Sequence, residues 1–152
     1  MQYWLMKSEP DIFSINDLKN RPQQTESWDG VRNYQARNFM RDQMRKGDLV
    51  LFYNSSCKEV GIAGIAQVVK ESHPDLSALD KESSYYDAKA TQDEPRWYMV
   101  AIKWKKTFKR IISLAELKKY QELKDLKLLQ KGNRLSIMPV SQNDFEFILN
   151  LE

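Results

Sequence analysis

Apolar runs of strand length recur along the chain and predict a domain rich in short strands. They occupy residues 3–7, 49–53, 60–69, 97–108 and 134–140. In the fourth run the apolar residues alternate with polar ones, as in a strand with one buried face. The first run stops just before Pro10, where proline removes a backbone donor and favours a turn. Gly61 and Gly64 interrupt the third run and predict tight bends, as at the corners of a barrel.

Residues that cap helices predict four helices between and after these strands. Ser14 precedes a short helix, and Asn33 precedes a longer one that we expect to span Tyr34 to Arg45. Ser113 begins a capping box, and Ser141 opens a last helix near the end of the chain. Of the four, the helix over Tyr34 to Arg45 has the clearest apolar face.

Residues 70–95 carry no clear period, and we expect them to form a partly ordered flap, since long irregular segments are often functional loops. Elsewhere, short strands punctuated by helices without a regular alternation of strand and helix favour an α+β fold. The sequence therefore predicts a small mixed β-barrel or curled sheet with peripheral α-helices. The 152 residues are of the usual size for one domain, so we expect a single domain over 1–152.

Composition excludes several classes of protein and site. Hydrophobic residues make up 41% and charged residues 30%, which is typical of a globular domain. Cys57 and His73 are the only cysteine and histidine, so we expect neither an internal disulfide nor a zinc site. The stretch 61–64 matches neither a phosphate-binding loop nor a complete dinucleotide motif, so no cofactor is expected. The net charge of +3 favours an anionic partner without deciding the question.

The N-terminal residues lack the charged start and long apolar core of a signal peptide, and no stretch is long and apolar enough to cross a membrane. We therefore expect no membrane association and a cytoplasmic location, or a nuclear one in a eukaryote. We also expect a monomer.

The block from Trp28 to Phe39, WDGVRNYQARNF, closely resembles the signature of the EVE-domain family. Further blocks match in order: YWLMKSEP at 3–10, GIAG at 61–64, YYD at 85–87, PRW at 95–97, LAEL at 114–117 and RLSI at 134–137. The resemblance implies a PUA-like fold and a non-catalytic module that binds nucleic acid carrying a modified base, flipped out into an aromatic-lined pocket. It favours modified cytosine in DNA, with a methylated base in RNA as the alternative.

The chain departs from the family pattern at two places. Asn54-Ser55-Ser56-Cys57 stands where the family often has His-Ser-Asn-Cys, and Met138 stands where glutamine is common. The resemblance implies these residues for the base-binding pocket: Trp28, Tyr53, Asn33, Tyr34, Lys7, Ser8, Asn54 and Ser136. Trp28 and Tyr53 would supply flat faces for stacking, although Trp28 can equally be a core aromatic. Asn33 can either cap its helix or present an amide to a base.

Arginines recur every four residues in the second predicted helix and make a basic stripe that suits a phosphate backbone. The predicted phosphate contacts are Arg32, Arg37 and Arg41. A solvated helix face is the alternative. Two other functions remain open on sequence alone: a small enzyme acting on a modified nucleotide, which would have to use Cys57 with His73 or a pair of carboxylates, and an adaptor that binds protein through its basic face.

Overall fold

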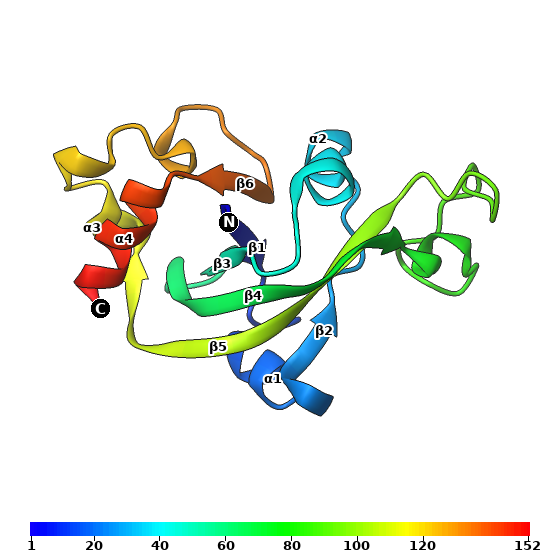
Figure 1. The fold of residues 1–152 in the computed structure, drawn as a ribbon, viewed down its shortest axis with the longest axis horizontal. Helices are drawn as coiled ribbons and strands as arrows, with labels where there is room; N and C mark the ends of the chain where they lie inside the picture. Colours follow the sequence, from blue (N-terminus) through cyan, green and yellow to red (C-terminus); the bar gives the residue numbers. More distant parts are fainter.

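The computed structural model describes residues 1–152 and has one six-stranded sheet at its centre, with helices on both faces (Figure 1). The strands are β1 (Tyr3–Ser8), β2 (Thr25–Ser27), β3 (Leu49–Asn54), β4 (Gly61–Pro74), β5 (Tyr98–Ser113) and β6 (Ile137–Val140). The α-helices are α1 (Ile15–Lys19), α2 (Tyr34–Asn38), α3 (Leu114–Leu117) and α4 (Gln142–Leu151). A π-helix covers Phe39–Gln43, and 3₁₀ turns cover Pro22–Gln24, Leu76–Leu79, Gln121–Leu123 and Lys127–Leu129.

The strands lie in the order β2-β5-β4-β3-β1-β6. The neighbours β1 and β3 are parallel and all other neighbours are antiparallel. Shifts of register between β4 and β5 mark bulges, which bend and twist a sheet.

The α+β class is confirmed, but the predicted barrel is wrong, because β2 and β6 end the sheet and do not pair with each other. The sequence could not distinguish a curled open sheet from a barrel, because both have the same alternation of apolar and polar residues and the same glycine bends. Closure depends on pairing between the edge strands, and β2 and β6 here have only three and four residues.

Both faces of the sheet are buried, because successive side chains of a strand point to opposite sides. In β1, Trp4 and Met6 belong to one apolar cluster and Leu5 belongs to the other. The first cluster also contains buried residues of α1, α2 and the π-helix, and the second contains buried residues of α3 and α4, including Phe145 and Ile148. The two helical layers therefore follow directly from the alternation in the strands.

The helix predicted over Tyr34 to Arg45 begins as expected, with the Asn33 side chain accepting a hydrogen bond from the backbone N–H of Ala36 at 3.0 Å. Its predicted end is wrong, because α2 passes into the π-helix and helical structure stops at Gln43. The cause is Asp48, which is 3% exposed. Its carboxylate accepts from the backbone N–H of Arg45 at 2.9 Å and from the Trp4 indole N–H at 3.0 Å, so Arg45 has left the helical pattern.

Residues 75–97 connect β4 to β5 and project from one end of the molecule, as the green arm at the right of Figure 1. The partly ordered flap was predicted over residues 70–95; residues 70–74 instead continue β4, because they pair with β5. The arm itself contains a 3₁₀ turn and a small apolar cluster of Ala78, Ala90 and Trp97. The indole N–H of Trp97 donates to Asp87 at 2.7 Å, and the backbone N–H of Asp75 donates to the Trp97 carbonyl at 2.9 Å. These contacts tie the two ends of the arm together.

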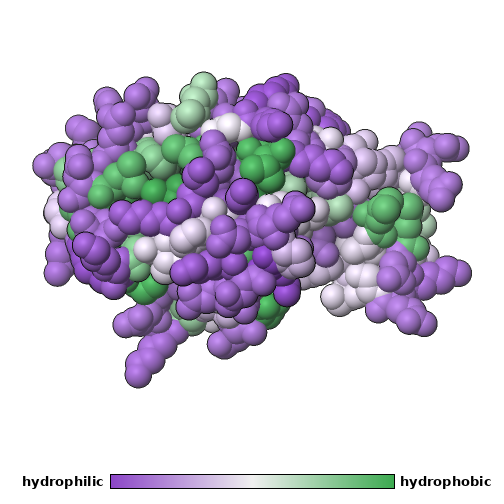
Figure 2. All heavy atoms as spheres, turned by 60° about the horizontal axis from the view of Figure 1, so that its bottom comes forward, coloured by the Kyte–Doolittle hydropathy of each residue, from purple (hydrophilic) through white to green (hydrophobic).

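The face seen in Figure 2 is mainly hydrophilic, with separate apolar patches. None of the helices has the length and hydropathy that a membrane span requires. No group of three or more His, Cys, Asp or Glu side chains is arranged to hold a metal ion.

Candidate functional site

A cavity of about 600 Å³ opens where the end of β1, the segment after β2 and the loop after β3 meet. Its walls are residues 7–9, 12–13, 26–32 and 55–56, together with Arg21, Tyr85, Arg134 and Ser136. Binding sites for small molecules commonly have volumes of roughly 300–1,000 Å³, so the cavity is large enough for one planar base.

Lys7, Ser8 and Ser136, which the resemblance placed together, lie side by side in this wall. The backbone N–H of Lys7 donates to the carbonyl of Ser136 at 2.9 Å, and the Ser8 hydroxyl donates to the Phe13 carbonyl. The Lys7 side chain is half-buried and has no carboxylate partner within ion-pair distance. Burial lowers the pKa of its ammonium group, because the charged form loses hydration.

Trp28 belongs to the core and also lines the cavity. It is 9% exposed, and its ring packs edge-on against Phe52 at 5.7 Å and Phe13 at 6.0 Å between centroids. The other three tryptophans donate their indole N–H to Asp48, Asp87 and Thr107. The Trp28 indole N–H makes no hydrogen bond within the protein, which leaves it available as a donor to a ligand.

Gly30 and Tyr85, 55 positions apart in the sequence, form another part of the wall. Gly30 has φ +79°, and a Cβ atom at this position would lie 2.4 Å from Cζ of Tyr85. Glycine therefore allows both the left-handed turn and the close approach of the tyrosine ring. The backbone N–H of Gly30 donates to the Asp75 carboxylate at 2.8 Å, which joins the wall to the projecting arm.

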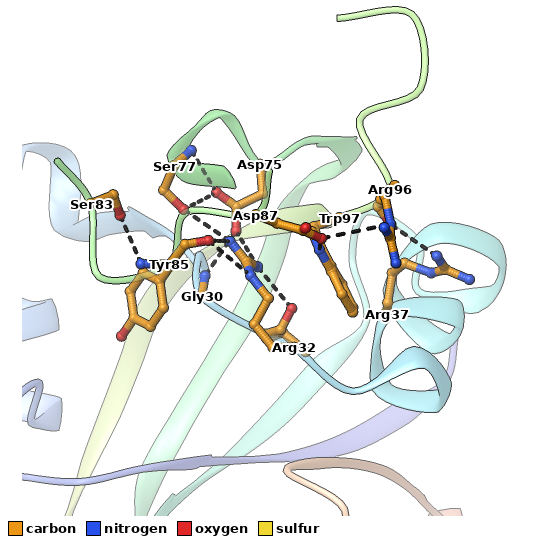
Figure 3. Close-up of polar contacts among 11 residues, drawn as sticks. Gly30, Arg32, Arg37, Asp75, Ser77, Ser83, Tyr85, Asp87, Arg96 and Trp97 are labelled. Atoms are coloured by element: carbon orange, nitrogen blue, oxygen red, sulfur yellow. Dashed lines mark hydrogen bonds and ion pairs between the residues drawn. The ribbon is translucent and has the colours of Figure 1, made fainter. Parts of the chain in front are cut away.

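Arg32, predicted to contact phosphate, lies at the edge of the cavity and holds the arm in place (Figure 3). Its guanidinium donates to Asp75 at 3.1 Å and to the carbonyl of Tyr85 at 2.8 Å, and it lies 5.2 Å from the centroid of the Trp97 ring. Burial acts to raise the pKa of Asp75, but hydrogen bonds from Ser77, Gly30 and Arg32 outweigh it and lower that pKa. Asp75 is therefore ionised and paired.

Arg37 and Arg41 lie outside the cavity lining, and both have partners within the protein. Arg37 donates to the carbonyl of Arg96 at 2.9 Å (Figure 3) and to the Asn38 side chain at 2.8 Å. Arg41 donates to both carboxylate oxygens of Asp42, at 2.8 and 3.0 Å. The arginine with no such partner is Arg134, which is exposed in the cavity wall and which the sequence did not single out.

Four residues implied for the pocket do not line this cavity. Tyr53 is 2% exposed in the second apolar cluster, and burial, followed by the nearby Cys57, raises its pKa to about 12. Asn54 lines a second cavity of about 480 Å³, which lies beside α1 and β5. Asn33 caps α2, and Tyr34 stacks on Trp97 with 4.9 Å between ring centroids.

The cavity also contains residues that the sequence analysis did not assign to it: Phe13, Glu26, Asp29, Tyr85 and Arg134 among them. Asp29 directly follows Trp28 in the family signature, and its pKa is raised by burial first, with the negative charges of Asp75 and Glu26 adding to the effect. Tyr85 and Arg134 also begin matched blocks, so their positions carried a signal. What the sequence could not supply was the contact between blocks far apart in the chain.

Comparison with known proteins gives a consistent result. The family model described as EVE domain matches residues 2–151. Human thymocyte nuclear protein 1 is 46% identical over 167 aligned residues, which cover 99% of this chain and 73% of that protein. A solved structure from Pseudomonas syringae is 52% identical with a TM-score of 0.93, covering 98% of both chains. The human THYN1 protein, solved in complex with 5-methylcytosine-containing DNA, is 45% identical with a TM-score of 0.94, covering 99% of this chain and 97% of that chain.

Proposed function

Because this chain belongs to the EVE domain family, we propose that it binds DNA carrying a modified cytosine and takes the extruded base into the cavity beside Trp28. Two observations carry the proposal. This chain has a cavity of suitable size, and a relative of the same fold, the human THYN1 protein, has been solved in complex with 5-methylcytosine-containing DNA. At 45% identity and a TM-score of 0.94, the two chains share the same overall fold, which supports the proposal.

The lining of the cavity suits a base better than a purely apolar or purely charged ligand. Trp28, Phe13 and Tyr85 offer aromatic surface, while Lys7 and Asp29 offer polar groups without an ion-pair partner. Extruding a base costs a few kcal/mol, and stacking on an aromatic ring returns about 1–3 kcal/mol. Hydrogen bonds to the base edge must supply the remainder and the specificity.

We propose that the chain binds the base without reacting with it. Neither Cys57 nor His73 lines the cavity, so the thiol and imidazole that one form of the enzyme alternative requires are not at the site. Of the carboxylates in the lining, Glu26 is held by Arg21. The serine hydroxyls in the lining have no histidine beside them; they belong to Ser8, Ser27, Ser55, Ser56 and Ser136. Incubation with a 5-methylcytosine oligonucleotide should therefore leave its nucleoside masses unchanged. A new nucleoside by mass spectrometry would support the enzyme alternative.

Phosphate contacts belong to the same proposal. Arg32, Arg37 and Arg41 remain candidates, although each would have to give up an internal partner to reach a phosphate. Arg134 has no such partner and lies at the cavity, so we add it as the first candidate. An unpaired surface arginine contacts a phosphate at lower cost than one held by a carboxylate.

The test is a binding titration with one duplex sequence in four forms: unmodified, with 5-methylcytosine, with N6-methyladenine, and as an RNA carrying 5-methylcytosine. The expected result is that the DNA with 5-methylcytosine binds tightest, by about tenfold over its unmodified form, as burying the one extra methyl group in an apolar part of the cavity would give. Equal affinity for modified and unmodified DNA would contradict the proposal. A preference for the RNA form would support recognition of the modified base but would identify RNA, and not DNA, as the nucleic acid that is bound.

A further inference from the structure

Asp29 is one of four charged side chains in the cavity lining that have no ion-pair partner, together with Lys7, Glu9 and Arg134. The other three are paired: Arg21 with Glu26 at 2.8 Å, and Arg32 with Asp75 at 3.1 Å. The Asp29 carboxylate accepts no hydrogen bond from another residue, and its side chain is exposed in the cavity wall directly after Trp28. An acceptor that the protein leaves unused at the edge of a binding cavity is free to accept from a ligand.

The backbone on both sides of Asp29 is fixed. The N–H of Trp28 donates to the carbonyl of Val100 in β5 at 2.8 Å, and the N–H of Gly30 donates to the Asp75 carboxylate at 2.8 Å. The carboxylate is therefore presented from a rigid segment, next to the aromatic ring that precedes it. Partial burial, together with Asp75 and Glu26, raises the pKa of Asp29, while its own backbone N–H and the charge of Arg32 act to lower it. The carboxylate is exposed and can be reached by a donor from a ligand.

The donors around this acceptor define which base edge fits. The half-buried ammonium of Lys7 and the unpaired indole N–H of Trp28 lie in the same wall. Together with Asp29 they offer one acceptor and two donors. Cytosine presents an exocyclic amine beside ring N3 and O2 acceptors, whereas thymine presents a carbonyl oxygen where cytosine has the amine. A thymine in this position would turn the lone pairs of that oxygen toward the carboxylate.

We propose that Asp29 is the specificity-determining residue that selects cytosine over thymine, by accepting a hydrogen bond from the exocyclic amine of the base. This inference rests on the proposed function, since it names the group that reads the base held in the cavity. It goes further in excluding a base: 5-methylcytosine and thymine carry the same methyl group, so recognition of the methyl group alone would not separate them. An acidic side chain that accepts from the cytosine amine is a common way for proteins to recognise this base.

The experiment compares two duplexes of one sequence that hold either 5-methylcytosine or thymine opposite an abasic site. No base pair has to break in either duplex, so the cost of extrusion is the same and only the base edge differs. The wild-type protein is expected to bind 5-methylcytosine about tenfold more tightly than thymine. In Asp29→Asn the amide offers both an acceptor and donors, so the ratio should fall to about threefold or less.

The matched control is Asp93→Asn, which makes the same substitution at an exposed carboxylate that lies outside the cavity lining and also has no ion-pair partner. It should keep the wild-type ratio. The inference is overturned if Asp29→Asn keeps that ratio while folding normally, or if Asp93→Asn abolishes it. A wild-type protein that prefers 5-methylcytosine to cytosine but does not distinguish it from thymine overturns the inference alone. One that binds no modified duplex overturns the proposed function as well.

Discussion

Trp28 occupies the boundary between the core and the cavity, and this position changes what its removal should do. Its ring contacts Phe13 and Phe52 in the first apolar cluster while the same side chain lines the cavity. Treated as a pocket residue alone, Trp28→Ala would leave the fold nearly intact. Because the ring is 9% exposed, we instead expect Trp28→Ala to lower the free energy of unfolding by about 3–5 kcal/mol. Loss of binding in that variant would not identify a pocket residue.

Trp28→Phe separates the two roles of this side chain. It keeps an aromatic ring in the core, so we expect a loss of roughly 1–2 kcal/mol in stability, while the missing indole N–H and smaller face weaken binding of 5-methylcytosine DNA about tenfold. Urea unfolding and a binding titration measure the two effects. Trp104→Phe is the control, because Trp104 is also partly buried but lies outside the cavity lining. Wild-type affinity in Trp28→Phe would assign Trp28 to the core only.

Asp29 also gives a prediction on stability. Its pKa is raised in the folded protein, mainly by burial, so the ionised form disfavours folding. This penalty is absent below the unfolded pKa near 3.8 and is complete once the pH has risen through the folded pKa. Asp29→Asn should therefore raise the Tm at pH 7, and the gain should disappear as the pH falls toward 3.8. A lower Tm at pH 7 would mean that the carboxylate has a stabilising partner. A functional residue that costs stability is common at binding sites.

At the scale of elements, the arm of residues 75–97 is the part that completes the cavity. It supplies Tyr85 to the wall and is held against the segment after β2 by Arg32 and Asp75. The contact at Gly30 leaves no room for a side chain, because a Cβ atom there would lie 2.4 to 2.7 Å from three ring atoms of Tyr85.

We therefore expect Gly30→Ala to destabilise the fold by about 1–3 kcal/mol and to loosen the arm, because the alanine is strained at φ +79° and displaces Tyr85. Gly47→Ala is the matched control, since Gly47 has φ +99° with no atom within 4 Å of the added methyl group. Its cost reports backbone strain alone. Limited proteolysis should cut within residues 75–97 faster in Gly30→Ala than in Gly47→Ala. Equal rates would mean that Tyr85 moves aside freely.

The elements that the sequence predicted are those whose signals are local. Strands such as β1 and β5 follow from apolar runs, and the caps at Ser14, Asn33 and Ser141 are found as expected because each involves residues three positions apart. The failures are long-range. The helix after Asn33 ends early where Asp48 accepts from the backbone N–H of Arg45, and the long-range part of this contact is the hydrogen bond from the Trp4 indole to the same carboxylate. The strand β2 (Thr25–Ser27) was missed because it is short, polar and stabilised by pairing with β5.

The candidate site divides in the same way. Lys7, Ser8 and Ser136 could be placed together because all three lie at or near strand ends that meet, and the parallel pairing of β1 with β3 brings the loop after β3 to the same edge. Tyr53 lies in the core. The sequence could not show this, because a shift of one residue in strand register moves every side chain to the other face of the sheet. The positions of Tyr85 and Arg134 at the cavity depend on tertiary contacts that no local pattern encodes.

For the molecule as a whole, the distribution of unpaired cations is more informative than the net charge of +3. Arg37 and Arg41 on the α2 side are hydrogen-bonded to Arg96, Asn38 and Asp42, so their charges are already partly satisfied. Arg134, in the cavity wall, has no hydrogen-bond partner within the protein. Each phosphate that a protein neutralises releases counterions and adds about 0.9 to the slope of log affinity against log salt.

Arg134→Gln is therefore expected to flatten that slope by about 0.9 and to weaken binding of modified and unmodified duplexes by the same factor, because a phosphate contact carries no base information. Arg41→Gln is the comparison: it removes the same charge at another candidate phosphate contact, but its guanidinium is held by Asp42, so we expect a smaller change in the slope than in Arg134→Gln. Titrations of one duplex from about 50 to 200 mM salt measure both variants. A flatter slope in Arg41→Gln, with no change in Arg134→Gln, would move the path of the DNA backbone from the cavity edge to the helix that begins at Tyr34. A change in the ratio of modified to unmodified affinity in Arg134→Gln would instead place this arginine on the base.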